Sequence, residues 1–210
     1  MEVLLATFSA LFSVVNPFGA TPLFVALTED LDKKARNEQA LKSSIYMIAI
    51  LVVFFFAGTI ILQFFGIRLE DIRIAGGILI VRSAFQLLSP GSHKGKHIDK
   101  EVKQEGMDKD DISFTPMAMP MLSGPGSIAL TIGMFDKAKG YMEYTYMIIA
   151  IILVAAASYI ILRSAVQLNK FLGKGGMAAL SRMMGFIILS IGISMILNGI
   201  ITLFEKYIIL

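Results

Sequence analysis

The stretch SVVNPFGATPLF, residues 13–24, places helix-breaking residues inside a run without any charge from residue 3 to residue 28. A run of this length is enough for a membrane helix, which needs about 20 apolar residues. Its centre is NPFG, Asn16 to Gly19, and another proline, Pro22, follows. These residue types favour turns and end helices. The stretch therefore predicts a spanning helix that is broken halfway.

The rest of the chain has the composition of a membrane protein. Its 210 residues are 56% hydrophobic and 17% charged, which leaves too little polar sequence to cover long apolar runs in water. The 19 basic and 16 acidic residues lie mostly in short segments between these runs, so we expect no nucleic-acid partner. The chain has no cysteine, which excludes disulfides and thiolate chemistry, and MEVLLATF does not predict a cleavable signal peptide.

Six apolar segments are long enough to cross a membrane. Five carry no charge, and the third carries only Arg82. We therefore predict an all-α polytopic membrane protein in contact with lipid, with six transmembrane helices at Val3–Thr28, Ser43–Ile67, Ile74–Ser92, Ile112–Phe135, Tyr144–Leu162 and Met183–Phe204.

The distribution of lysine and arginine predicts the orientation. Segments 29–42, 93–111 and 163–182 carry thirteen of these residues, whereas the segments on the opposite side carry five. By the positive-inside rule, the first group is cytoplasmic and both termini lie outside the cytoplasmic (inner) membrane. The charged linker 93–111 contains His93 and His97, but neighbouring glycines disfavour the helix that would bring them together, so we expect no metal site.

The sequence contains an internal duplication. RIAGGILI, Arg73–Ile80, matches RMMGFIIL, Arg182–Leu189, at a shift of 109 residues, and NPFG matches GPGS, Gly124–Ser127, at a shift of 108. Since each half has three spans, the second half must enter the membrane from the opposite side, as in inverted-repeat transporters. We therefore predict two inverted three-helix repeats, at residues 1–92 and 112–210, joined by a cytoplasmic linker at residues 93–111.

The second copy of the break lies in the fourth span. Pro116 and Pro120 precede the run Ser123–Ser127. Proline removes a backbone donor and glycine tolerates non-helical dihedral angles, so helices 1 and 4 should both unwind near the bilayer centre. Backbone groups freed there must face protein, water or a ligand, because lipid offers them no hydrogen bond.

The chemistry of the two breaks predicts a substrate site. The half-helix after each break points its N-terminal amides into the gap, which suits a carboxylate. Freed carbonyls with the side chains of Asn16, Thr21, Ser123 and Ser127 suit an ammonium group or a small cation. The pocket fits a small zwitterion such as glycine or alanine. The alternative is that both breaks are proline kinks stabilised by neighbouring helices.

Other intramembrane features have less specific interpretations. Arg82 either binds a substrate carboxylate or extends its guanidinium toward the cytoplasmic face. The last span has glycines spaced by seven and a second stripe of small polar residues, both of which favour close helix packing. These residues are Gly185, Gly192 and Gly199, and Ser190, Ser194 and Asn198.

Residues that are missing also restrict the function. No Asp, Glu or His lies inside a predicted span, so a side-chain proton relay is not expected. The chain lacks the H-E-x-x-H and G-x-S-x-G motifs, and we expect neither an enzyme nor a cofactor. A coupling ion, proton or sodium, and assembly into a homo-oligomer stay open.

Four segments carry a resemblance to a known family. NPFGATPLF, RIAGGILI, PMLSGPGSIALT and RMMGFIILSIGISMILNGI resemble the signature segments of the MarC family of six-span membrane proteins, in family order from Leu11 to about Ile201. The resemblance implies a relation to amino-acid exporters of the lysine-exporter type. It also implies a similarity to some archaeal members that transport small neutral amino acids, glycine and alanine.

Carried over to this chain, the resemblance places the substrate site at Asn16, Pro17, Phe18 and Gly19 and at Ser123, Gly124, Pro125, Gly126 and Ser127. We therefore predict a secondary transporter that moves small neutral amino acids by alternating access. The alternatives are a channel for a small solute or an ion, in which the breaks form a fixed filter, and a non-transporting membrane scaffold.

Overall fold

The computed structural model describes residues 1–89, 111–138 and 140–208 of the chain, and every regular element in these ranges is helical. The predicted linker 93–111, with His93 and His97, therefore lies almost entirely outside the described residues. In chain order the elements are α1 (Glu2–Val15), α2 (Pro17–Leu27), α3 (Lys33–Phe64), α4 (Leu69–Leu88), η1 (Ser113–Leu122), α6 (Pro125–Lys137), α7 (Tyr141–Arg163) and α8 (Ala165–Ile208).

Several helices are long and apolar enough to cross a membrane. In the described part of the chain these are α1 with α2, α3, α7 and the Gly175–Lys206 part of α8. The pair η1 and α6, bent by 63°, adds a fifth span if it is counted as one. These segments agree with five of the six predicted spans.

The remaining predicted span, Ile74–Ser92, does form a helix, α4, but α4 is not among the helices that are long and apolar enough to cross a membrane. Besides Arg82 it contains Glu70, Asp71 and Arg73 near its N-terminus. The prediction of six spans is therefore not confirmed by helix length and composition.

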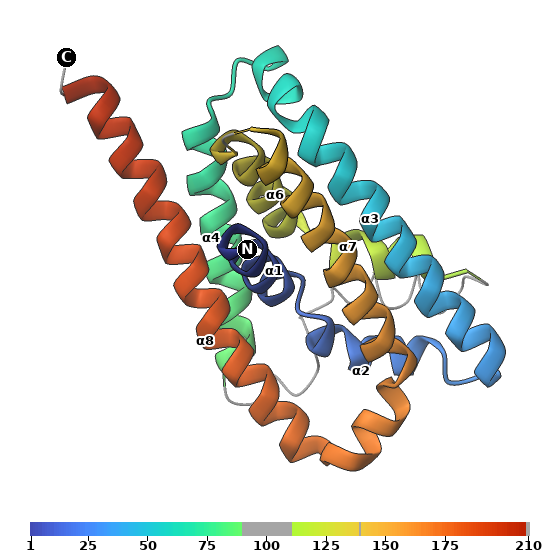
Figure 1. Ribbon diagram of the computed structural model, residues 1–210. Coiled ribbons are helices and arrows are strands. Elements are labelled where there is room, and N and C mark those ends of the chain that lie inside the picture. Colours follow the sequence, from blue (N-terminus) through green and yellow to red (C-terminus); the bar gives the residue numbers. More distant parts are fainter. Residues whose placement is uncertain (90–110, 139, 209–210) are drawn as a thin grey trace.

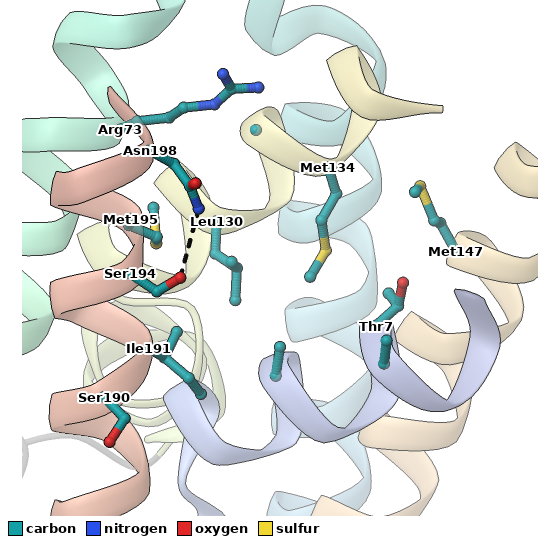
Figure 2. Close-up of a pocket in the computed structure, with 13 residues that line it drawn as sticks. Thr7, Arg73, Leu130, Met134, Met147, Ser190, Ile191, Ser194, Met195 and Asn198 are labelled. Carbon is teal, nitrogen blue, oxygen red and sulfur yellow. Dashed lines mark hydrogen bonds between the residues drawn. The ribbon is translucent and has the colours of Figure 1, made fainter. Parts of the chain in front are cut away.

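The helices do not form a simple parallel bundle. Figure 1 shows α1 nearly end-on, while α3, α4, α7 and α8 extend across the view. The close-up in Figure 2 agrees, since α1 there runs across the direction of α8. The first helix therefore crosses the long helices steeply instead of running beside them.

The contacts between helices follow a regular scheme. The helix α3 packs on α7, and α4 packs on α8. Most of the remaining contacts form pairs in which a helix from the first half and a helix from the second half exchange roles. These pairs are α1 with α7 and η1 with α3, α2 with α8 and α6 with α4, α2 with α7 and α6 with α3, and α1 with α6 and η1 with α2. The contacts of α8 with α1 and with α7 have no comparable counterpart among the described residues.

Glycines allow α4 and α8 to approach closely, as the spacing in the last span predicts. A Cβ atom on Gly192 would lie 3.0 Å from the carbonyl oxygen of Gly77, and one on Gly77 would lie 2.7 Å from that of Gly192. Gly199 packs in the same way against Ile74. The packing role that was predicted for the glycine stripe is confirmed.

Two apolar clusters meet where α1 ends. The larger joins α1, α2, α3, η1 and α7 and includes Leu11, Val15 and Phe24. The smaller joins α1, α4, α6 and α8 and includes Val14 and Ile80. Because Val14 and Val15 belong to different clusters, the first break is fixed between two packed regions.

Candidate functional site

The first break is a single residue. Asn16 separates α1 from α2 and adopts φ 47° and ψ 66°, the left-handed conformation that asparagine tolerates better than most residues. Its Oδ1 accepts a hydrogen bond from the Gly19 amide at 3.2 Å, which caps α2. The predicted break at Asn16 is confirmed.

The other end of the Asn16 side chain is unsatisfied. Asn16 has no exposed surface, and its Nδ2 has no hydrogen-bond partner among the described residues. A Cβ atom on Gly19 would lie 2.5 Å from this nitrogen, so only glycine leaves room for it. Leaving a buried polar group unpaired costs about 1–3 kcal/mol, which points to a water or ligand at this position.

The second break is longer and more irregular. The segment η1 has extended dihedral angles at Thr115 and Met119, the residues before its two prolines, as steric clash with the proline ring predicts. Its hydrogen bonds are wide: the Ser123 amide donates to the Ala118 carbonyl, five residues back, at 2.8 Å. The chain then turns, and α6 begins at Pro125.

This break also holds an unsatisfied polar atom. Ser123 is fully buried, and its Oγ has no partner in the described ranges. The neighbouring Ser127 hydroxyl donates to the Leu122 carbonyl at 3.2 Å, so it is already paired. The α6 N-terminus has no side-chain cap, which leaves its first amides available to an anion.

The regions around the two breaks touch each other. A Cβ atom on Gly126 would lie 3.7 Å from Cγ1 of Val14 and 2.6 Å from Cγ1 of Ile80. The first turn of α6 therefore packs against the last turn of α1 and the middle of α4. Since Asn16 follows Val14 by two residues and Ser123 precedes Gly126 by three, the breaks flank this contact.

The other predicted site residues differ in their surroundings. Pro17 and Thr21 are buried, and the Thr21 hydroxyl donates to the Phe18 carbonyl at 2.8 Å. The half-buried Phe18 ring packs edge-on against Phe12. Gly124 is half-buried, whereas Pro125 is exposed and lies outside the enclosed part of the break.

A cavity of about 460 Å³ lies beside the breaks, between α1, α4, α6, α7 and α8. Figure 2 shows Arg73 at one end, Ser190 at the other, and Ser194 and Asn198 along the α8 wall. None of the predicted break residues lines this cavity. On α1 the nearest lining residue to Asn16 is Ala10, about 9 Å away at helical rise.

Sequence reasoning missed this cavity. It grouped Arg73 with the charges outside the membrane and assigned the polar stripe of α8 to packing. The sequence feature that could have indicated the cavity is the presence of two stripes of small residues on α8. The glycine stripe faces α4, while Ser194 and Asn198 lie on another side of the helix and line the cavity. Arg82, the charge that was singled out, is exposed and does not line the cavity.

Metal-binding chemistry has no support in the described ranges, which contain no group of three or more His, Cys, Asp or Glu residues that could hold an ion.

The apolar helices and the two buried breaks define a polytopic α-helical membrane protein with discontinuous helices. The chain belongs to the MarC family: the model described as MarC family integral membrane protein matches residues 1–204.

Relatives agree with this assignment. The chain is 38% identical to a UPF0056 membrane protein of Methanocaldococcus jannaschii, over 95% of this chain and 97% of that protein. It is 33% identical to the UPF0056 inner membrane protein MarC of Escherichia coli K12 and 31% identical to that of Citrobacter koseri, in both cases over 94% of this chain and 93% of the relative. No solved structure matches the chain.

Proposed function

We propose that this protein is a secondary transporter that moves small neutral amino acids, glycine and alanine, across the cytoplasmic membrane by alternating access. The observation that carries the proposal is the pairing of the breaks. Each holds a fully buried polar atom without a partner among the described residues, Asn16 Nδ2 in one and Ser123 Oγ in the other.

The free groups suit the two ends of a zwitterion. Asn16 Nδ2 offers two N–H donors, the Ser123 hydroxyl offers another, and the uncapped α6 N-terminus adds amides with a positive dipole. These groups favour a carboxylate. Pro17 has no backbone N–H, so it cannot donate to the Ser13 carbonyl one turn earlier, and this acceptor suits the ammonium group. Gly19 and Gly126 leave little free space, which favours a small side chain.

Helix contacts support the inverted repeat on which alternating access would depend. If α1 corresponds to η1, α2 to α6, α3 to α7 and α4 to α8, most contacts between helices map onto another contact or onto themselves. In transporters of this kind the substrate site lies near the midplane, at corresponding helix breaks. The positive-inside rule supports a topology with both termini outside, and two relatives are named inner membrane proteins.

Counterflow in proteoliposomes tests the proposal. Vesicles that contain the purified protein and unlabelled glycine are diluted into a trace of labelled glycine. A transporter gives a transient accumulation of label that saturates with glycine concentration and is absent from protein-free vesicles. Flux that rises linearly with concentration and shows no exchange would instead indicate a channel. Repeating the assay with proton or sodium gradients identifies the coupling ion.

A further inference from the structure

We propose that the cavity of Figure 2 is a second binding site for the amino acid, in which Arg73 recognises the carboxylate. This inference rests on the proposed function only for the identity of the ligand. The site is separate from the breaks, because none of their residues lines the cavity.

Arg73 is a buried charge with unused hydrogen-bonding capacity. Its side chain is 10% exposed, and its Nη2 donates to Asp136 Oδ2 at 3.1 Å. This is the one partner that the described residues give to a guanidinium with five N–H donors. A Cβ atom on Gly133 would lie 3.7 Å from Arg73 Nε, so the arginine extends over a residue without a side chain.

The partner of Arg73 can be displaced. The Asp136 side chain is 51% exposed, so water competes for its carboxylate, whereas the Arg73 side chain is only 10% exposed. A carboxylate that enters the cavity can make paired hydrogen bonds with the guanidinium, a geometry that arginine favours. Asp136 then remains close enough to accept a hydrogen bond from the ligand's ammonium group. The ion pair between Arg73 and Asp136 is thereby replaced by two, one between Arg73 and the ligand's carboxylate and one between Asp136 and the ligand's ammonium group.

The rest of the wall suits a small amino acid. Ser194 and Asn198 face the cavity from α8, and Asn198 Nδ2 donates to Ser194 Oγ at 3.4 Å (Figure 2). Met134, Met147 and Met195 supply an apolar surface that adapts its shape to a short aliphatic side chain.

The position of the ion pair connects this site to the second break. Asp136 lies near the end of α6, the helix that begins at that break, and Arg73 lies on α4. A ligand that takes Arg73 therefore replaces the direct ion pair between α4 and the far end of α6 with contacts that pass through the ligand. The occupant of the cavity thus changes how one of the two broken helices is held.

Labelling of a single cysteine tests this inference without measuring transport. The natural chain has no cysteine, so Ser194→Cys gives one reactive thiol in the cavity, and Gln63→Cys gives an exposed control outside it. In nanodiscs, where both faces are accessible, anionic and cationic methanethiosulfonates are compared. We expect the ratio of anionic to cationic rate to be about tenfold higher at Ser194→Cys, because of the nearby guanidinium.

Two further variants identify the charge. Arg73→Gln should return this ratio to the control value. Asp136→Asn should raise it, because the arginine loses its anionic neighbour, and this variant keeps the test decisive if Arg73→Gln does not fold. Glycine should slow labelling at Ser194→Cys and not at Gln63→Cys, whereas glycinamide, which lacks a carboxylate, should not protect either position.

Equal rate ratios at Ser194→Cys and Gln63→Cys, or equal protection by glycine and glycinamide, would overturn the inference even if glycine counterflow were observed. Conversely, if counterflow fails while the anionic preference is present and disappears in Arg73→Gln, the proposed function fails and the carboxylate site stands.

Discussion

The two helix breaks both interrupt a helix, but different residues produce them. The first uses one residue, Asn16, which adopts the left-handed conformation and caps the next helix with its own side chain. The second uses two prolines, an irregular segment and the uncapped start of α6. In the proposed site, the first break would therefore contribute side-chain donors, and the second would contribute a hydroxyl group and a helix terminus.

The breaks also differ in how they are supported. Gly126 of α6 packs on Ile80 of α4, and Gly76 of α4 packs on Ala129 of α6. The entry to η1 is fixed by Asp111, which accepts a hydrogen bond from the Ser113 amide at 2.9 Å, whereas α1 has no side-chain cap at its start. Changes at α4 should therefore affect the second break more than the first.

The largest expected effect is at the first break. Asn16→Asp keeps the oxygen that caps α2 and replaces the free N–H donors with a second oxygen. Glycine affinity should fall about 100-fold, because a hydrogen bond to a charged group contributes about 1.5–3 kcal/mol. Isothermal titration calorimetry measures the affinity, and Asn37→Asp, outside both breaks, is the matched control. Unchanged affinity in Asn16→Asp would remove the first break from the site.

Glycine substitution tests the support of the second break. Gly76→Leu places a side chain where Ala129 already packs, so overpacking should lower the free energy of unfolding by about 2–3 kcal/mol. Gly175→Leu is the matched control, since a Cβ atom there meets nothing within 4 Å. Thermal unfolding in detergent measures both. Equal stability in the two variants would show that α4 does not support α6.

Ser123→Ala separates binding from stability. It removes a hydroxyl group that is buried without a partner in the described structure, so thermal stability should stay unchanged or rise. Glycine affinity should nevertheless fall about tenfold, the equivalent of a hydrogen bond of about 1.4 kcal/mol. Ser44→Ala, a buried serine paired within α3, should leave affinity unchanged. If Ser123→Ala binds glycine normally, the second break contributes no side chain to the site.

The smallest effect concerns pH at the entry to η1. The hydrogen bond from the Ser113 hydroxyl, aided by the Lys42 ammonium, lowers the pKa of the Asp111 carboxyl. Because the pKa of this carboxyl in the folded protein is below its unfolded value of about 3.9, the ionised group stabilises the protein at pH above that unfolded value. This stabilisation is lost as the pH falls through the folded-state pKa. Asp111→Asn should remove this acid sensitivity and cost less than about 1 kcal/mol at neutral pH. Thermal unfolding midpoints of the natural protein and of Asp111→Asn are measured between pH 7 and pH 3. An equal decrease in both proteins would contradict this role.

The sequence predicted local features better than long-range ones. Both breaks follow from proline, glycine and asparagine within a few residues, and the contact of α4 with α8 follows from glycine spacing. The two stripes of α8 indicate two different faces of that helix, but the sequence does not show that the polar face lines a cavity, because this depends on which face of α8 turns toward α1. The ion pair of Arg73 with Asp136 joins residues 63 positions apart, and no local pattern connects them.

Whether the two breaks form one binding site can be decided with a double-mutant cycle. Glycine affinity is measured by calorimetry for the natural protein, Asn16→Gly, Ser123→Ala and the double variant. Groups that bind the same carboxylate should be coupled, so the combined loss should differ from the sum of the single losses by more than about 1 kcal/mol. Losses that add within about 0.5 kcal/mol, or a natural protein that does not bind glycine, would show that the two breaks do not form one glycine site.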